Sequence, residues 1–340
     1  MNHLAYPFQI PSTLHADTPA EYYLNKREAV RLLVQDRLSG ECFHQSFVNL
    51  DRYLQKGDVL ILNNSRTIPA VLYTVNQVEV RLARKVTSNT WEALIIGTQP
   101  NIGDTLSFPN HVKGLVMRKN LETPLVSIQF SVSGDDFYEF LYQFGSPIRY
   151  EYIKKEWPID AYQTVFSSVP GSIEMPSAGR ALSWKMLAKL QKEGIEIGFI
   201  QLHTGLSYYG DNRWPEPSKH PERFSVSSEV VNLIEAAKAR GSKVIAVGTT
   251  VVRALESAVD ANAVLHPVTG ETTLHIKEDS LLHVVDGLLT GFHETEASHL
   301  DMLSAFIHSS HLLSTYQEAI HQGYLWHEFG DMNLLLRLDQ

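Results

Sequence analysis

The segment Ser242-Lys-Val-Ile-Ala-Val-Gly-Thr-Thr-Val-Val-Arg-Ala-Leu-Glu256 places a short apolar run directly before a helical pattern. Residues 244–247 are apolar, mostly β-branched, and bounded by Gly241 and Gly248, which predicts a buried parallel strand. Helix-forming residues follow over 251–259. The segment therefore indicates a strand, a tight turn and a helix.

The turn between this strand and helix carries two hydroxyl side chains. Gly248, Thr249 and Thr250 stand where a helix start leaves backbone N–H groups free, and such groups favour an anion or a ribose. Arg253 follows one turn later, and its side chain is long enough to reach the same helix start. An ordinary turn with a threonine cap and an Arg253–Glu256 surface pair fits the same pattern.

Length and composition bound the fold and the function. The chain has 340 residues, more than a single core usually fills, so two domains are expected. Hydrophobic residues make up 44% and charged residues 20%, which is typical of a soluble globular protein. The formal net charge of −9 argues against nonspecific coating of nucleic acid, but it permits a locally basic cleft.

Cysteine usage and hydropathy exclude several further classes. Cys42 is the single cysteine, so the sequence excludes an intramolecular disulfide and a thiolate metal cluster. Residues 1–23 lack the apolar segment of a secretory signal, and no apolar run approaches the length of a membrane span. We therefore expect a cytoplasmic protein without membrane contact.

The pattern of apolar and turn residues along the chain changes twice. Over 68–148, short alternating runs separated by turn residues predict a small antiparallel β-barrel domain. Over 1–67 and 149–340, strands alternate with helices, which predicts an α/β domain with a mainly parallel sheet flanked by helices. The barrel is thus expected as an insertion in the α/β domain.

Three expected elements bear on the functional site. Ser183 is expected to cap a helix over 184–192, because an amphipathic pattern begins directly after it. Nearer the C-terminus, residues 282–286 read as a strand that precedes the loop containing His293, and 299–311 read as one helix.

Polar residues follow several of the predicted strands. Asn64 and Arg66 follow the predicted buried strand 58–62, and His203 follows the predicted strand 195–202, with His220 in the loop beyond it. Open α/β folds collect ligand-binding groups at the carboxyl ends of strands, so these residues are candidates for one site. Polar turns and structural histidines are the alternative interpretation.

Motifs for common cofactors are missing. The run 293–301 contains His, Glu and Asp side chains, but its spacing differs from the two-histidine helical turn of zinc proteases. We expect no metal, with a metal in this run as the open alternative. Neither a dinucleotide glycine motif, nor a phosphate-loop lysine, nor a Gly-x-Ser-x-Gly elbow is present, which argues against the corresponding enzyme classes.

Several runs together match one family from Arg31 to Asp331. They are Asp58-Val-Leu-Ile-Leu-Asn-Asn-Ser-Arg-Thr-Ile-Pro-Ala70, Tyr162-Gln-Thr-Val165, His203 with Gly205, His220-Pro-Glu222, Val244 to Glu256, and Phe292-His293. With these runs the chain resembles the S-adenosylmethionine:tRNA ribosyltransferase-isomerases of queuosine biosynthesis. The resemblance implies an α/β domain with an inserted β-barrel.

The resemblance also implies a reaction. The ribosyl group of S-adenosylmethionine passes to a 7-aminomethyl-7-deazaguanine base at the tRNA wobble position and rearranges to an epoxycyclopentane, which gives epoxyqueuosine. Adenine and methionine are released. This chemistry needs a base that removes a proton beside the sulfonium, a group that assists adenine departure, and shielding from water. The implied partners are S-adenosylmethionine and the tRNA anticodon. A monomer is favoured, and the sequence leaves the oligomeric state open.

The matching positions supply the candidate residues. The catalytic candidates are His203, His220, Glu222 and His293. The candidates for substrate binding are Asn64, Arg66, Tyr162, Gln163, Gly179, Gly205, Gly248, Thr249, Thr250, Arg253 and Asp331.

The chain departs from the family pattern in loops expected around the site. In the run 176–182, Arg180 stands in place of the family's leucine and Ala181 in place of its histidine. The segments 205–209 and 291–295 are altered as well, and Val71 replaces an arginine. These changes indicate a divergent member. Two alternatives remain: a paralogue that binds S-adenosylmethionine or a nucleoside but uses another acceptor, and a non-catalytic binding protein.

Overall fold

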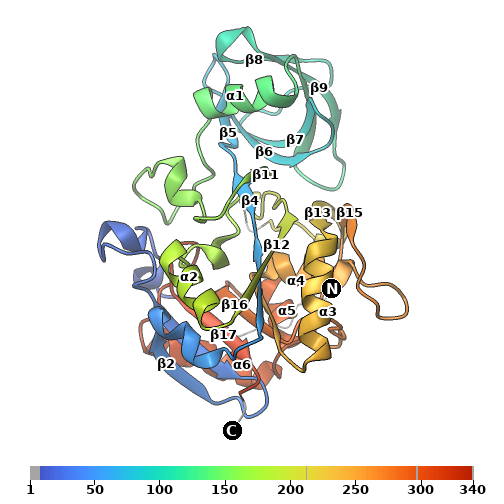
Figure 1. The fold of residues 1–340 in the computed structure, drawn as a ribbon. Helices are drawn as coiled ribbons and strands as arrows, with labels where there is room; N and C mark the ends of the chain where they lie inside the picture. The colour runs from blue at the N-terminus through green and yellow to red at the C-terminus, as the bar shows by residue number, and fades with distance from the viewer. Residues whose placement is uncertain (1–7, 212, 296–297, 339–340) are drawn as a thin grey trace.

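A computed structural model describes residues 8–211, 213–295 and 298–338. A nine-stranded sheet forms its larger part, and a separate six-stranded sheet stands above it in Figure 1. The order of the nine strands is β15 (Val268–Thr272), β13 (Glu222–Val226), β12 (Glu196–Leu202), β3 (Val59–Asn63), β14 (Val244–Val247), β16 (Gly287–Gly291), β17 (Met332–Leu336), β1 (Arg31–Asp36) and β2 (Cys42–Ser46).

The strand directions in this sheet are mixed. The strands β12, β3, β14 and β16 run parallel to one another, and β17 runs parallel to β1. The pairs β15–β13, β13–β12, β16–β17 and β1–β2 are antiparallel. This corrects the expectation of a mainly parallel sheet. Short connections such as the turn between β1 and β2 return the chain antiparallel, because a parallel neighbour requires a longer crossover.

Helices cover both faces of the sheet. They are α2 (Trp184–Lys192), α3 (Ser228–Ala239), α4 (Thr249–Ser257), α5 (His299–Ser304) and α6 (Ser309–His321). The chain also forms short 3-10 helices at Ser12–Leu14, Ala20–Tyr22, Phe47–Tyr53, Ile159–Tyr162, Ser177–Gly179 and Pro217–Lys219, and one at Pro109–His111 within the part that carries the six-stranded sheet. The expected cap of α2 is confirmed, because the Ser183 hydroxyl accepts the Met186 N–H at 3.2 Å.

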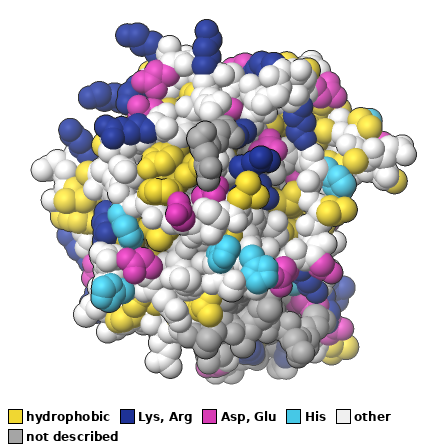
Figure 2. All heavy atoms as spheres, turned by 90° about the horizontal axis from the view of Figure 1, so that it is seen from below, with side chains coloured by type: hydrophobic (Ala, Val, Ile, Leu, Met, Phe, Trp, Pro, Cys, Tyr) yellow, Lys and Arg dark blue, Asp and Glu magenta, His cyan; other side chains and the backbone are white. Residues whose placement is uncertain are grey.

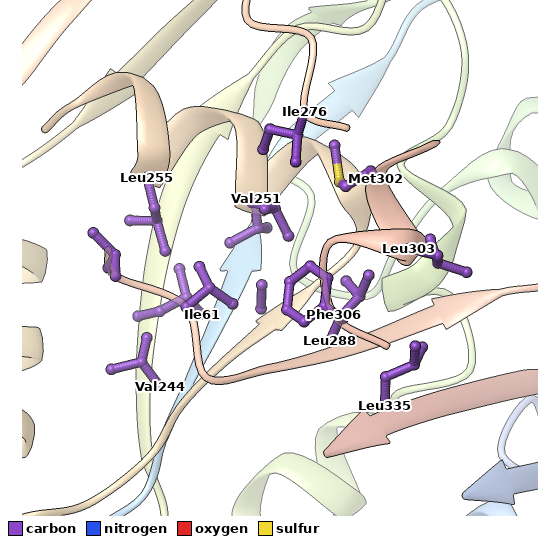
Figure 3. Close-up of a cluster of buried hydrophobic side chains, with 14 of the residues drawn as sticks. Ile61, Val244, Val251, Leu255, Ile276, Leu288, Met302, Leu303, Phe306 and Leu335 are labelled. Carbon is purple, nitrogen blue, oxygen red and sulfur yellow. The ribbon is translucent and has the colours of Figure 1, made fainter. Parts of the chain in front are cut away.

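The central strands are buried on both faces, and alternate residues enter two different cores. Ile61 and Val244 pack with α4 and α5 in the cluster of Figure 3, to which Val251 and Leu303 also belong. Leu60, like the other alternate residues of β3 and β14, belongs to the core beneath α2. Burial of each such aliphatic side chain contributes about 1.5–3 kcal/mol, so continuous apolar runs are needed here.

The second sheet is antiparallel throughout. Its order is β5 (Val71–Tyr73), β6 (Glu79–Lys85), β7 (Thr90–Ile96), β10 (Leu125–Phe130), β9 (Lys113–Lys119) and β8 (Thr105–Ser107). The Val75 N–H donates to the Ser107 carbonyl at 2.8 Å and so joins the two edges, which curls the sheet into a half-barrel. Helix α1 (Gly134–Phe144) packs onto its core through Phe137 and Phe140.

A narrow connection joins the two sheets. Strand β3 continues upward in Figure 1 into β4 (Ser65–Thr67), which pairs in parallel with β11 (Val169–Ser172). Val71 and Ser146 then pair with each other where the chain enters and leaves the half-barrel. The carboxyl ends of β3 and its parallel neighbours therefore face the half-barrel.

Two expected elements near the C-terminus differ in the structure. No strand covers 282–286; the strand is β16, directly after it. The Glu256 carboxylate accepts the backbone N–H groups of residues 283–285 at 2.9–3.1 Å, so a side chain takes the bonds that a neighbouring strand would need. The expected helix over 299–311 is broken into α5 and α6, and the His308 side chain accepts the Ser310 N–H at the new start.

On the end of the molecule opposite the half-barrel, Lys and Arg side chains gather along one edge, at the upper left of Figure 2, with acidic side chains between them. In the described ranges, no helix combines the length and the apolar character that crossing a bilayer requires.

Candidate active site

Two adjoining cavities lie between the nine-stranded sheet and the half-barrel. The first, of about 990 Å³, is called here the α4 cavity because the start of α4 forms part of its wall. The second, of about 1360 Å³, is called the aromatic cavity after its Tyr150, Tyr152 and His327 rings. Glu174 and His293 line both, so the cavities share a wall. The site lies at the carboxyl ends of the parallel strands, where open α/β folds bind ligands.

The start of α4 opens directly into the α4 cavity. Gly248 has φ 98°, a value that only glycine adopts without strain, and it turns the chain from β14 into the helix. Thr249 and Thr250 line the cavity beside it. No threonine side chain caps this helix, so the simple cap interpretation is wrong. The Thr250 hydroxyl instead accepts the Asn63 side-chain amide at 3.2 Å.

Arg253 is held by groups from two other segments. Its guanidinium forms an ion pair with Glu222, and its Nε donates to the Leu274 carbonyl at 3.1 Å. The other Glu222 oxygen accepts the Gly205 N–H at 2.9 Å. Arg253 Nη2 is buried and has no partner in the described part of the chain, so one edge of the guanidinium is available to an anion. The surface pair with Glu256 is not formed.

Two histidines stand at the junction of the two cavities. His293 Nε2 lies 2.8 Å from the Thr290 hydroxyl, and its ring stacks on His299 at a centroid distance of 4.5 Å. Burial lowers the pKa of His293 well below its ordinary value and lowers the pKa of His299 to about 4. Both rings are therefore neutral near pH 7 and act there as hydrogen-bonding groups.

Two further histidines line the α4 cavity alone. His220 lies 3.1 Å from the Tyr209 hydroxyl, and burial lowers its pKa. His275 Nε2 lies 3.0 Å from Asp301 Oδ2, and both side chains face the cavity. The sequence pattern had not singled out His275.

Two half-buried carboxylates, Glu174 and Glu328, line the aromatic cavity. Glu174 accepts hydrogen bonds from Tyr150 and from Ser207, whose N–H and hydroxyl each lie 2.7 Å away. Glu328 accepts from the Tyr152 hydroxyl. Burial raises the pKa of Glu174, and it raises the pKa of Glu328 to about 7.

Aromatic rings form a partial stack over these carboxylates. Tyr152 stacks on His327 at 4.0 Å between centroids, and His327 stacks on His15 at 4.7 Å. Tyr150 lies 6.1 Å from Tyr152. Arg149 lines the same cavity, so aromatic faces and positive charge stand together. This combination is typical of surfaces that bind unstacked nucleobases and their phosphates.

His203 lies outside both sets of lining residues. Its Nδ1 lies 2.7 Å from the Ser65 hydroxyl, which in turn lies 2.6 Å from the Ser172 hydroxyl. Burial lowers the pKa of His203 to about 4. A Cβ on Gly171 would lie 2.6 Å from the ring, so the site around His203 is tightly closed. The structure places His203 in the wall between β4, β11 and β12.

Four more candidates hold the backbone in place. Gln163 bonds both backbone groups of Thr67 at 2.8 and 3.0 Å. Asp331 accepts the N–H groups of Arg31 and Leu325 at 2.7 and 2.8 Å. The Asn64 N–H donates to the Ile200 carbonyl at 2.9 Å. At Gly179 a Cβ would lie 2.7 Å from the Phe166 ring, so this glycine permits close packing.

The two other binding candidates lie nearer the aromatic cavity. Tyr162 lines it, and its buried hydroxyl has no partner within the described segments. Arg66 lies 3.4 Å from the Tyr142 hydroxyl of α1 and does not line either cavity. Of the fifteen sequence candidates, nine therefore line a cavity: Gly205, His220, Glu222, Gly248, Thr249, Thr250, Arg253 and His293 in the first, and Tyr162 in the second.

The acidic and histidine-rich run 293–301 does not assemble a metal site in the described residues. No group of three His, Cys, Asp or Glu side chains with a suitable arrangement occurs among them. Glu296 lies outside the described residues. His293, His299 and Asp301 instead bond or stack with Thr290, with each other and with His275.

Comparison with known proteins decides the family. The sequence model of the family described as queuosine biosynthesis protein matches residues 4–335. The chain belongs to this family. The membership that the motifs implied is thereby confirmed.

Named relatives cover nearly the whole length of this chain. It is 34% identical to the S-adenosylmethionine:tRNA ribosyltransferase-isomerase of Carboxydothermus hydrogenoformans, over 97% of this chain and 98% of that protein. The enzyme of the same name from Moorella thermoacetica is also 34% identical, with the same coverage. The crystal structure of S-adenosylmethionine tRNA ribosyltransferase from Thermotoga maritima is 24% identical, has a TM-score of 0.57 and covers 98% of this chain and 100% of that one. This last likeness shows the shared fold.

One departure from the family pattern has a clear structural consequence. Arg180 is buried and forms two hydrogen bonds with the Glu21 carboxylate at 2.7 and 2.8 Å, and its Nε donates to the Ala161 carbonyl at 2.9 Å. Arg180 therefore ties the loop 176–182 to the N-terminal segment and lines neither of the two large cavities. Ala181 is buried beside it.

The sequence patterns did not point to several polar residues that line the two cavities. Glu174, Glu328 and His275 meet their partners only through long-range contacts, and no local spacing marks them. The one usable signal was the segment 149–155, where Tyr150 and Tyr152 alternate with charged residues.

Proposed function

We propose that the chain transfers and isomerises the ribosyl group of S-adenosylmethionine onto 7-aminomethyl-7-deazaguanine in tRNA, giving epoxyqueuosine. The relatives named above carry the enzyme name that this proposal extends to the chain. One observation carries the proposal: Arg253 presents a buried, unpartnered Nη2 beside the start of α4, in a cavity that adjoins a second one lined by aromatic rings.

The α4 cavity suits the donor. The carboxylate of the methionyl group is anionic and fits the free edge of Arg253 and the positive end of the α4 dipole. The ribose hydroxyls match the Thr249 and Thr250 region of the same wall. Glu222 and Gly205 serve this site by holding Arg253 and the adjoining loop in position.

The aromatic cavity suits the acceptor. A wobble base turned out of the anticodon loop would stack on rings such as Tyr152 and His327, and Arg149 and Arg213 would meet its phosphates. His293 stands where the two cavities meet, so a group on the donor and a base in the acceptor site would approach each other beside it. Enclosure between the two sheets limits water at this point.

The remaining sequence candidates receive supporting roles in this proposal. His203, Asn64, Gln163 and Asp331 stabilise the walls through the hydrogen bonds described above. His220 faces the donor, and Tyr162 faces the acceptor. Soluble monomeric action on tRNA, without a metal, belongs to the same proposal.

A second candidate is a paralogue with the same donor and another acceptor. It is favoured by Arg180 and Ala181, which replace the family's leucine and histidine and change how the loop 176–182 is held. Ser177 of this loop lines both cavities, so the altered loop borders donor and acceptor alike.

Calorimetric titration with S-adenosylmethionine tests the donor site. Arg253→Gln should weaken binding about 10-fold or more, because a charge-assisted hydrogen bond is lost. Arg223→Gln is the matched control, since Arg223 lies on the same strand as Glu222 but pairs with Glu271 on the exposed side. Unchanged affinity in Arg253→Gln would refute the donor position.

Product analysis separates the two candidates. Purified enzyme is incubated with S-adenosylmethionine and tRNA carrying 7-aminomethyl-7-deazaguanine, and the digested nucleosides are measured by mass spectrometry. Epoxyqueuosine and released adenine support the first candidate. Donor binding without product supports the second, and absence of donor binding overturns both.

A further inference from the structure

The wall of the α4 cavity carries a histidine–carboxylate pair. His275 Nε2 lies 3.0 Å from Asp301 Oδ2, and their side chains are 16% and 12% exposed. His275 belongs to the loop after β15, and Asp301 belongs to α5. Both line the cavity that contains the start of α4 and Arg253.

The loop that carries His275 is fixed on both sides of the imidazole. The Leu274 carbonyl accepts Arg253 Nε at 3.1 Å, and the Leu274 N–H donates to the Thr272 hydroxyl at 3.1 Å. Ile276 is buried in the same core cluster as Met302, the residue after Asp301, and both point toward that cluster in Figure 3. The backbone on either side of each partner is therefore anchored, which limits the positions available to the pair.

This pairing fixes the tautomer of the neutral His275 imidazole. A carboxylate only accepts, so Asp301 holds the proton on Nε2 and leaves Nδ1 as the acceptor of the neutral ring. The other cavity histidines differ. Among the described residues, the His293 ring bonds the Thr290 hydroxyl and the His220 ring bonds the Tyr209 hydroxyl, whereas His275 bonds a carboxylate. A carboxylate also stabilises the imidazolium that forms when the ring takes up a proton.

We propose that His275 is the general base of the reaction in the α4 cavity and that Asp301 is its positioning residue. This inference rests on the proposed function. His275 Nδ1 takes the proton from the donor carbon attached to the sulfonium sulfur, and the electron pair of that C–H bond stays on the carbon beside the positive sulfur. That pair then forms a double bond to the neighbouring ring carbon, whose bond to the ring oxygen breaks. The ring oxygen forms a carbonyl with the carbon that held adenine, and adenine leaves with the electron pair of its bond and takes the proton from the imidazolium. The histidine ends the cycle neutral.

Turnover and donor binding of the full-length enzyme test this assignment together. His275→Ala should lower kcat about 100-fold or more, the usual range for loss of a general base, while the dissociation constant for S-adenosylmethionine stays unchanged. Added imidazole should restore part of the lost turnover in His275→Ala. Asp301→Asn should lower kcat without rescue by imidazole, because the ring is still present but is no longer oriented.

A second pair in this chain provides the matched control. His266 Nε2 and Asp260 Oδ2 are also 3.0 Å apart, but their side chains are 53% and 36% exposed and neither lines the α4 cavity. His266→Ala and Asp260→Asn should leave kcat unchanged. Proton exchange supplies an acceptor-free readout: in deuterated water the wild type should incorporate deuterium beside the sulfonium of recovered S-adenosylmethionine, and His275→Ala should not.

The outcomes distinguish a failure of the His275 assignment from a failure of the proposed function. An active wild type whose His275→Ala variant keeps its kcat, or loses it without any rescue by imidazole, overturns the role of His275 alone. A wild type that forms no epoxyqueuosine and exchanges no deuterium overturns the proposed function, and the assignment of His275 with it. Deuterium exchange without epoxyqueuosine supports His275 as the base and directs attention to another acceptor.

Discussion

At the scale of single residues, the candidate site combines a half-buried ion pair with histidines whose charge is suppressed. Arg253 of α4 is a cation whose partner Glu222 comes from strand β13, and its remaining edge faces a cavity. His293 and His299 are held neutral by burial. Arg253 thus keeps its charge while the two histidines lose theirs. Such differences are characteristic of ligand sites, because burial and specific partners shift the protonation of side chains most strongly there.

Glu328 leads to a prediction about pH. Burial raises its folded pKa to about 7, above the unfolded value of about 4.5, so the folded protein holds this proton more tightly between those values. The stabilisation is present below about pH 4.5 and is lost as the pH rises to about 7. Glu328→Gln removes the titration and should gain up to about 3 kcal/mol over the wild type across this window.

Urea denaturation at a series of pH values measures this difference. The subtraction cancels the contributions of other titrating groups, and Glu151→Gln, an exposed acidic neighbour of Tyr152, is the control. A constant difference between wild type and Glu328→Gln from pH 4.5 to 7.5 would contradict the prediction.

At the scale of the element, the segment from β14 to α4 is the best-determined part of the site. Its strand lies over 244–247 as the apolar run indicates, and its helix begins at Thr249, two residues before the helical pattern alone predicts. The spacing within this segment lets all four of its candidate residues line the α4 cavity: Gly248, Thr249, Thr250 and Arg253. What the pattern left open was the partner of Arg253, because that partner lies 31 positions away.

Gly248 provides a test of this element. Gly248→Ala should destabilise the protein by about 1–3 kcal/mol, because φ 98° with ψ 151° is a region that only glycine occupies without strain. The new Cβ would also lie 3.3 Å from Ala178, so donor affinity should fall. Chemical denaturation and calorimetry measure the two effects.

Gly241→Ala is the matched variant. Gly241 also has a positive φ, 75°, but a Cβ there meets nothing within 4 Å. It should lose some stability and keep full donor affinity. Equal donor affinity in Gly248→Ala and Gly241→Ala would show that the start of α4 does not contact the donor.

At the scale of the whole molecule, we propose that residues 68–148 fold as a unit within an α/β domain formed by 1–67 and 149–340. Val71 and Ser146 exchange backbone hydrogen bonds of 2.9 Å where the chain enters and leaves, so an Asn-Gly turn can replace residues 72–145. The shortened chain should unfold cooperatively and form no product, because the aromatic cavity loses one wall. If calorimetry of the shortened chain showed no unfolding transition, the α/β domain could not fold without residues 72–145.

The aromatic cavity also predicts a salt dependence of tRNA binding. Arg149→Gln combined with Arg213→Gln should weaken binding and reduce the slope of log affinity against log salt by about 1–2, because two phosphate contacts are removed. Lys192→Gln, at the end of α2 and outside both cavities, should leave the slope unchanged. Filter-binding titrations at several salt concentrations measure it, and an unchanged slope in the double variant would place the tRNA elsewhere.

The sequence by itself determined the features that depend on near neighbours. Apolar runs, turn residues and motifs gave the strand expected over 58–62 and found at 59–63, the strand 244–247, the capped helix after Ser183, the antiparallel half-barrel and the family. Local hydrogen bonding and side-chain periodicity decide such elements, and both are legible in a short window.

Only the tertiary structure decided the mixed strand directions, the displaced strand β16 and the identity of the polar pairs. Glu256 prevents a strand at 283–285 by binding its N–H groups, and Asp301 meets His275 from a separate helix. These outcomes depend on which distant groups are brought within hydrogen-bonding reach when the cores pack. For that reason the position of the α4 cavity was foreseeable, whereas the histidine proposed as its base was not.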